Sequence, residues 1–263
     1  MKLRLAEKTM KSLFFPGALL TIILSCQVQK QTVHDAHLDI ENEQDLYSMA
    51  TADEGKVQSP INILTCNLKE GEDRQVDIDC PDGIKIETIT NTGHSVQLNF
   101  KSGSEVVLDD LHYKMIQAHF HTPSEHQVDG VTFPMEMHFV NQLVSEHDNS
   151  GYLVIAWLFK MGEANDFIDE FMARIPQEEH HTVKAGETTK WDQEWMLDET
   201  DHTLHYYYYE GSLTTPPFDE TVKWLVAKKM FEASPEQIRY INSLEGNNAR
   251  HVHALFNREI QNN

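Results

Sequence analysis

Short segments that alternate apolar and polar residues dominate the chain from about Val57 onward. Each is rich in Val, Ile, Phe and Tyr and is bounded by Gly, Asn or Asp, which is the pattern of strands separated by turns. We expect strands at residues 84–89, 95–100, 105–108, 115–121, 135–143, 152–159, 203–209 and 222–227.

Helical periodicity is sparser and occurs at residues 165–174 and 234–244. In the second segment Ser234 is the expected N-cap and Pro235 the first helical residue. Because strands do not alternate regularly with helices, a parallel doubly wound sheet is disfavoured. The pattern predicts one mostly-β domain at residues 51–263.

The first 25 residues differ from the rest, because basic residues precede an apolar run at 13–24. That run is shorter than the roughly 20 residues of a membrane-spanning helix, so residues 1–25 are predicted to be a signal peptide, followed by a polar tether at 26–50. Cys26 ends a sequence that resembles a loose lipobox. We expect export to the periplasm. A lipid anchor at Cys26, simple cleavage near it and an uncleaved anchor are the alternatives.

The composition supports a globular domain with an acidic surface. Of the 263 residues 40% are hydrophobic and 9% aromatic, which is enough for a core and argues against global disorder. The formal charge of −21 repels phosphate backbones, so no nucleic-acid partner is expected. Export would also expose Cys66 and Cys80 to oxidation. The alternatives for them are a disulfide or two free buried thiols.

The main candidate chemistry lies on two predicted strands. The strand period of two places Gln117, His119 and His121 on one face, and Glu136 and His138 on one face of the next strand. Three neutral imidazoles and a water form an open tetrahedral zinc site, the catalytic type. Gln117 and Glu136 could orient the rings. The alternative, histidines without a metal, would bury unpaired polar groups at a cost, so the spacing favours a metal site.

Six ordered motifs closely resemble those of the α-class carbonic anhydrases, over about residues 55–260. They are Gln58-Ser59-Pro60-Ile61-Asn62-Ile63, Gly93-His94-Ser95, Gln117-Ala118-His119-Phe120-His121, Ser124-Glu125-His126, Glu136-Met137-His138 and Gly211-Ser212-Leu213-Thr214-Thr215-Pro216-Pro217. The resemblance implies a large, mainly antiparallel twisted sheet with a few peripheral helices. It also implies a metal at the base of a cone-shaped cleft.

The resemblance implies roles at the metal, residue by residue. It makes His119, His121 and His138 the ligands of one Zn²⁺ per chain, and it makes Gln117 and Glu136 the groups that hold two of those rings. These roles agree with the face pattern of the two strands.

It implies further roles around the metal. Thr214 would accept a hydrogen bond from zinc-bound hydroxide and donate its own proton to Glu125, and Thr215 would contact bicarbonate. His94 would be the proton shuttle, since an imidazole exchanges protons near neutral pH. The apolar wall for carbon dioxide would consist of Val140, Val154, Leu213 and Trp224.

The expected reaction is therefore the reversible hydration of carbon dioxide to bicarbonate and a proton, by attack of zinc-bound hydroxide. A catalytically silent binding module and a periplasmic zinc-binding protein are the alternatives. Two features stand apart from the prediction. The Trp-x-Tyr and Gly-Pro-x-x-Trp segments usual near the family's N-terminus are absent from residues 34–54, and His251 with His253 are either packing residues or a second metal site. Arg250 resembles a buried structural arginine.

Overall fold

The structure is a computed structural model that describes residues 55–263, except 73, 75, 81–82, 146–150, 187–189 and 192. The predicted signal peptide, the tether, Cys26 and the atypical segment at 34–54 lie outside the described residues. Within the described part of the chain, no helix has both the length and the apolar character needed to cross a membrane.

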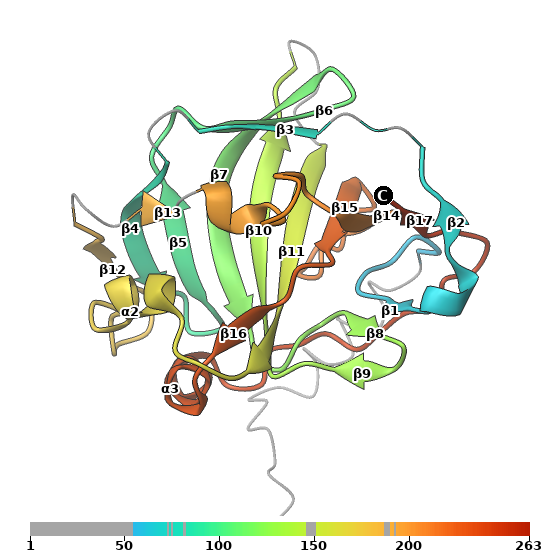
Figure 1. The fold of residues 1–263 in the computed structure, drawn as a ribbon. Helices are drawn as coiled ribbons and strands as arrows, with labels where there is room; N and C mark the ends of the chain where they lie inside the picture. Colours follow the sequence, from blue (N-terminus) through green and yellow to red (C-terminus); the bar gives the residue numbers. More distant parts are fainter. Residues whose placement is uncertain are drawn as a thin grey trace, which may run out of the picture. The chain divides into compact units, whose positions relative to one another are not determined.

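A 14-stranded sheet organises the described residues, and Figure 1 shows its central strands side by side. Its main path runs through β12 (His181–Lys184), β4 (Ile84–Asn91), β5 (Val96–Phe100), β7 (Leu111–His121), β10 (Met135–Leu143), β11 (Tyr152–Met161), β15 (Val222–Ala227), β14 (Tyr206–Gly211), β17 (Gln261–Asn262) and β2 (Lys69–Glu70).

Smaller elements surround this path. In the same sheet β3 (Val76–Asp79) pairs with β6 (Glu105–Leu108), β6 with β7, β13 (Lys190–Trp191) with β4, and β16 (Phe231–Ala233) with β11. A three-stranded sheet consists of β1 (Asn62–Ile63), β8 (Gln127–Val128) and β9 (Val131–Thr132). The helices are α2 (Asp166–Met172) and α3 (Pro235–Glu245), with 3₁₀ turns η1 (Thr65–Asn67) and η2 (Gln193–Met196).

The large sheet is mixed but mainly antiparallel. Strands β15 and β16 run parallel to β11, and β2 runs parallel to β17, whereas the other pairs of this sheet are antiparallel. The predicted mostly-β class and the large twisted sheet with few helices are confirmed.

The sheet has a different apolar cluster on each face. On β7 and β10, Phe120 and Phe139 belong to the larger cluster, which the buried apolar side chains of α2 and α3 join. On the opposite face Val140 belongs to the smaller cluster, together with Trp224 of β15. The period of two therefore sends His119, next to Phe120, to the side of the smaller cluster.

Of the two alternatives left open for the cysteines, the structure does not contain the disulfide. Cys66 lies exposed in η1, Cys80 is buried, and both are free thiols. Cys80 continues the alternation of Val76 and Ile78, so its side chain turns into the larger core cluster, where its Sγ lies 3.9 Å from Sδ of Met115. The alternative of two free buried thiols is right only for Cys80.

Candidate metal centre

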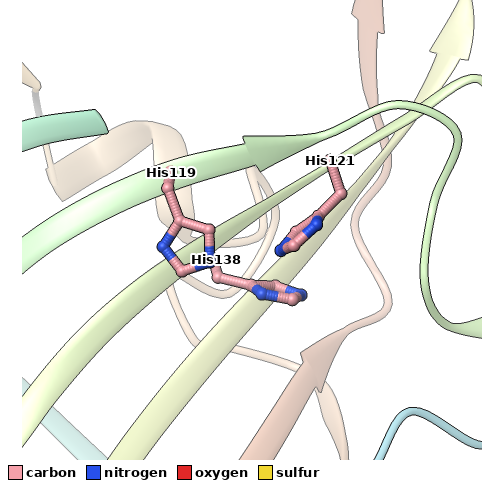
Figure 2. A group of neighbouring side chains, drawn as sticks. All are labelled: His119, His121 and His138. Carbon is pink, nitrogen blue, oxygen red and sulfur yellow. The ribbon is translucent and has the colours of Figure 1, made fainter. Parts of the chain in front are cut away.

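The pairing of β7 with β10 brings three imidazoles together. His119 lies directly opposite His138, and His121 lies opposite Glu136. Figure 2 shows the three rings gathered together. Their centroids lie 4.6 to 5.2 Å apart. One nitrogen from each ring lies within 4.8 Å of the other two. The structure thus gathers all three predicted ligands.

Hydrogen bonds decide which nitrogen of two of these rings is available. Nδ1 of His119 lies 2.9 Å from Oε1 of Gln117, an oxygen that can only accept, so Nδ1 carries the proton and Nε2 keeps a lone pair. In the same way Nε2 of His138 lies 2.6 Å from Oε1 of Glu136 and carries the proton. Nδ1 of His138 therefore keeps the lone pair that can bind a metal.

Burial keeps the three rings neutral. It lowers the pKa of His121 to about 4 and that of His119 well below its usual value, and it also lowers the pKa of His138. Any positive charge on His121 or His138 would lower the pKa of His119 further. Neutral rings keep the lone pairs that a metal requires.

The donor set fits zinc. The ring of His121 is buried beside Asn248, which raises the pKa of the ring, and neither ring nitrogen has a hydrogen bond of standard geometry among the described residues. A cation would satisfy one of the two nitrogens. A tetrahedral zinc ion with Zn–N bonds of about 2.0–2.1 Å needs donors roughly 3.4 Å apart, which is compatible with the 4.8 Å limit of this group. Three protein donors leave one position open.

Glu136 is held by four donors. Its Oε2 accepts the backbone N–H groups of Glu125 and His126, both at 2.8 Å, and its Oε1 accepts ring N–H groups of His126 and His138, both at 2.6 Å. Burial alone would raise the pKa of Glu136, but the two histidines lower it well below its usual value. Although His126, Glu136 and His138 lie close enough to hold an ion, these oxygens are already occupied, so we assign the group to hydrogen bonding.

The carboxyl group of Glu125 lies beside two of the histidines. Its Oε2 lies 3.5 Å from Nε2 of His121 and 3.9 Å from Nδ1 of His138, and its Oε1 accepts the backbone N–H of Arg250 at 3.0 Å. Burial raises the pKa of Glu125 to about 7, although His138, the Arg250 amide and the Thr214 side chain hold it down. Thr214 thus lies close enough to Glu125 to lower the pKa of that carboxyl, as the predicted pair requires.

A cavity of about 210 Å³ opens beside the imidazoles. Every residue predicted for the apolar wall lines it, together with Thr214, Thr215, His119 and His138. Its lining consists of Ile116, Gln117, His119, His138, Val140, Tyr152, Val154, Leu213, Thr214, Thr215 and Trp224. The indole of Trp224 also packs edge-on against the ring of His138, at 4.9 Å between centroids.

His94 lies apart from this lining. It is exposed, in the turn between β4 and β5, and its backbone carbonyl accepts a hydrogen bond of 2.7 Å from the side chain of Asn248. The shuttle role stays a prediction.

Sequence reasoning assigned no role to two residues of the cavity lining, Ile116 and Tyr152, or to His126, which bonds Glu136. Tyr152 had a detectable signal, because it shares a face with Val154 two residues away. Ile116 had none, because alternation places it on the face opposite to Gln117, and both line the cavity where the pairing of β7 with β10 shifts register between Val140 and Asn141. His126 belongs to the Ser124-Glu125-His126 motif, but its place between Glu136 and the hydroxyl of Tyr209, 2.6 Å from Nε2, depends on strand pairing and was not predicted.

Fold and site together define a class of protein, a β-sheet enzyme with a three-histidine metal centre beside a small, partly apolar cavity. Within that class the chain belongs to the eukaryotic-type carbonic anhydrase family, whose model matches residues 42–263. This is the α-class family of lyases. Its general reaction is the hydration of carbon dioxide, and its members use zinc.

Individual relatives agree with the family. A carbonic anhydrase of Pectobacterium atrosepticum is 35% identical over 207 residues, which cover 79% of this chain and 77% of the relative. The structure of the α-carbonic anhydrase of Photobacterium profundum is similar, with a TM-score of 0.70, 31% identity, and coverage of 83% of this chain and 95% of that chain. Dioscorin DB3L of Dioscorea polystachya is 32% identical, covering 80% of this chain and 76% of the relative.

Proposed function

We propose that this protein is a zinc-dependent carbonic anhydrase that interconverts carbon dioxide and bicarbonate, with His119, His121 and His138 as the zinc ligands. The observation that carries the proposal is the convergence of three neutral imidazole donors beside an apolar cavity, with one coordination position left for solvent.

The metal and its ligands have separate tasks. Zinc held there lowers the pKa of a coordinated water and supplies the nucleophile near neutral pH, a behaviour for which carbonic anhydrases are themselves the standard example. Gln117 and Glu136 fix the orientation of two rings by accepting their N–H groups at 2.9 and 2.6 Å. Such partners also make the rings stronger ligands.

Thr214 orients the attacking oxygen. A dication beside Glu125 favours the charged carboxylate, which then accepts the hydroxyl proton of Thr214. With its proton so engaged, the oxygen of Thr214 can only accept, and this fixes the direction of a lone pair on the nucleophile. Glu125 is in turn held by the backbone amide of Arg250.

The cavity wall receives the substrate. Val140, Val154, Leu213 and Trp224 form an apolar surface for carbon dioxide, and Thr215, exposed at the same cavity, is the predicted contact of bicarbonate. An apolar wall binds a nonpolar gas weakly and lets the charged product leave.

His94 is proposed to carry the proton outward. Each hydration releases one proton at the metal, and an imidazole that reaches solvent can accept it and pass it to buffer. The exposure of His94 at the turn before β5 supports this role.

We further propose that the protein is exported to the periplasm and attached there through a lipid on Cys26. The basic and apolar pattern of residues 1–25 supports this proposal. Cell fractionation of the wild type and of Cys26→Ser tests it, because the variant should move from the membrane to the soluble periplasmic fraction.

Stopped-flow measurement of carbon dioxide hydration tests the proposed function. The zinc-loaded protein should be active, a chelator should abolish the activity, and one equivalent of zinc should restore it. His121→Ala should bind no tight zinc and show no turnover, whereas His112→Ala, an exposed histidine paired with Glu105, should match the wild type. One tight zinc without turnover would favour a silent relative, and several weak zincs a storage protein.

A further inference from the structure

A buried carboxylate outside the metal centre joins the two segments that carry predicted functional histidines. Glu245, 7% exposed, is the last residue of α3, which contacts β5 and β7 (Figure 1). Its Oε2 accepts the backbone N–H of Val96 at 3.0 Å, and its Oε1 accepts the hydroxyl of Thr122 at 3.0 Å. Val96 is two residues after His94, and Thr122 directly follows His121.

The side-chain amide of Asn248 also joins the turn that carries His94 to the end of β7. The side chain of Asn248 donates to the carbonyl of His94 at 2.7 Å and to that of Phe120 at 3.1 Å, and its Oδ1 accepts the N–H of Thr122 at 3.0 Å. Asn242 adds a bond of 3.0 Å to the hydroxyl of Thr122. We call Thr122, Asn242, Glu245 and Asn248 the α3 clamp.

The clamp acts on the turn from both sides of the exposed histidine. Asn248 holds the carbonyl of His94, and Glu245 holds the amide of Val96. Within the turn, Gly93 takes a positive φ of 84°, and Thr92 bonds the amides of His94 and Ser95. The turn is thus locally ordered, but its position relative to the end of β7 depends on the clamp.

We infer that Glu245 is a positioning residue for proton transfer, holding the turn that carries His94 at a set distance from the end of β7 that carries His121. The inference rests on the proposed function. Proton transfer through a side chain and ordered water depends steeply on geometry, whereas attack on carbon dioxide depends on the metal, Thr214 and the cavity wall. Loosening the clamp should therefore slow proton transfer more than attack on carbon dioxide.

The kinetic test separates these steps. In weak buffer Glu245→Ala should lower kcat about tenfold and change kcat/KM for carbon dioxide less than twofold, with added imidazole restoring kcat. Glu245→Gln should stay close to the wild type. Its amide oxygen can accept from Val96 and its NH₂ can donate to Thr122, whose hydroxyl then turns to the carbonyl of Gly246, 3.1 Å away. Glu236→Ala, an exposed position on the same helix, is the matched control.

Hydrogen exchange on the same samples reports the clamp without turnover. The Val96 amide should exchange at least tenfold faster in Glu245→Ala than in the wild type. In Glu245→Gln and Glu236→Ala its exchange rate should stay close to that of the wild type. If Glu245→Ala does not fold, Thr122→Val replaces it, because it removes one of the two bonds to Glu245. This variant should also lower kcat more than kcat/KM.

Three results would overturn the inference. They are an equal loss of kcat and kcat/KM that imidazole does not restore, an unchanged kcat, and unchanged exchange at Val96. A wild type without turnover would reject the proposed function and with it the proton-transfer role. In that case the exchange rates would still show whether Glu245 holds the turn.

Discussion

At the scale of single residues, Gln117 decides which nitrogen of His119 faces the cavity. Gln117→Leu removes that acceptor and frees the ring to rotate, so we expect zinc affinity to fall by about 10- to 100-fold. Competition with a chelator of known affinity measures the effect. Gln127→Leu is the control, because the side chain of Gln127 bonds Thr132 on the small sheet, away from the metal centre, and an equal loss there would contradict the assignment.

Thr214 offers a test of orientation without loss of metal. Thr214→Val keeps the shape of the side chain but removes the hydroxyl that bonds Glu125, so kcat/KM should fall by about 100-fold while one zinc per chain is retained. Stopped-flow rates and metal analysis measure both quantities. Thr132→Val, exposed on β9, should leave both unchanged. Full activity in Thr214→Val would remove the proposed role of this residue.

Glu245 gives the stability of the fold a dependence on pH. Burial raises its pKa to about 8, although the bonds from Val96 and Thr122 lower it, so folding favours the protonated acid. The contribution of this group is therefore most favourable below the ordinary pKa of Glu and is lost as pH rises to about 8. Each pKa unit corresponds to about 1.4 kcal/mol.

Glu245→Gln cannot ionise, so its stability relative to the wild type should increase between pH 5 and pH 8. Urea unfolding at the two pH values measures the difference, and Glu236→Gln, at an exposed position on the same helix, should show little change. A constant difference between Glu245→Gln and the wild type would mean that Glu245 does not titrate in this range.

At the scale of elements, alternation predicted the long strands and missed the short ones. Strands β6, β10 and β15 have the predicted bounds. The start of β14 was placed three residues early, because the side chains of Thr203 and His205 bond Asp201 in the preceding loop. Strands of two or three residues, such as β2 and β16, are too short for a period to be visible and depend on neighbouring strands.

Helix α3 begins at the residue that its capping signal predicted. The cap should also contribute measurably to the free energy of unfolding. The hydroxyl of Ser234 accepts the backbone N–H of Gln237 at 3.2 Å, and the side chain of Gln237 accepts the N–H of Ser234 at 3.1 Å. Ser234→Ala should lower the free energy of unfolding by about 1 kcal/mol in urea titrations. Ser243→Ala, an exposed position late in the helix, should cost less, and equal costs would contradict the capping assignment.

At the scale of the whole molecule, the order of the strands makes the site. The faces of His119 and His138 follow from local alternation, but their direct opposition depends on β7 pairing with β10. No local pattern fixes that pairing, and the resemblance to a known family supplied it. His126 and Glu245 escaped prediction for the same reason, because their partners are distant in sequence or on other elements.

The two described cysteines report on the integrity of the whole domain. Cys66 is exposed, whereas Cys80 is 4% exposed in the larger core cluster, and burial raises its pKa to about 11. Because the thiolate is the reactive form, Cys80 should resist alkylation until the domain unfolds. A Cys26→Ser form, treated with iodoacetamide without reductant, should gain one adduct when native and two in concentrated urea. Cys80→Ala on that background should gain one adduct in both conditions. A disulfide between Cys66 and Cys80 would instead give no adduct in either condition until a reductant is added, and intact mass separates these outcomes.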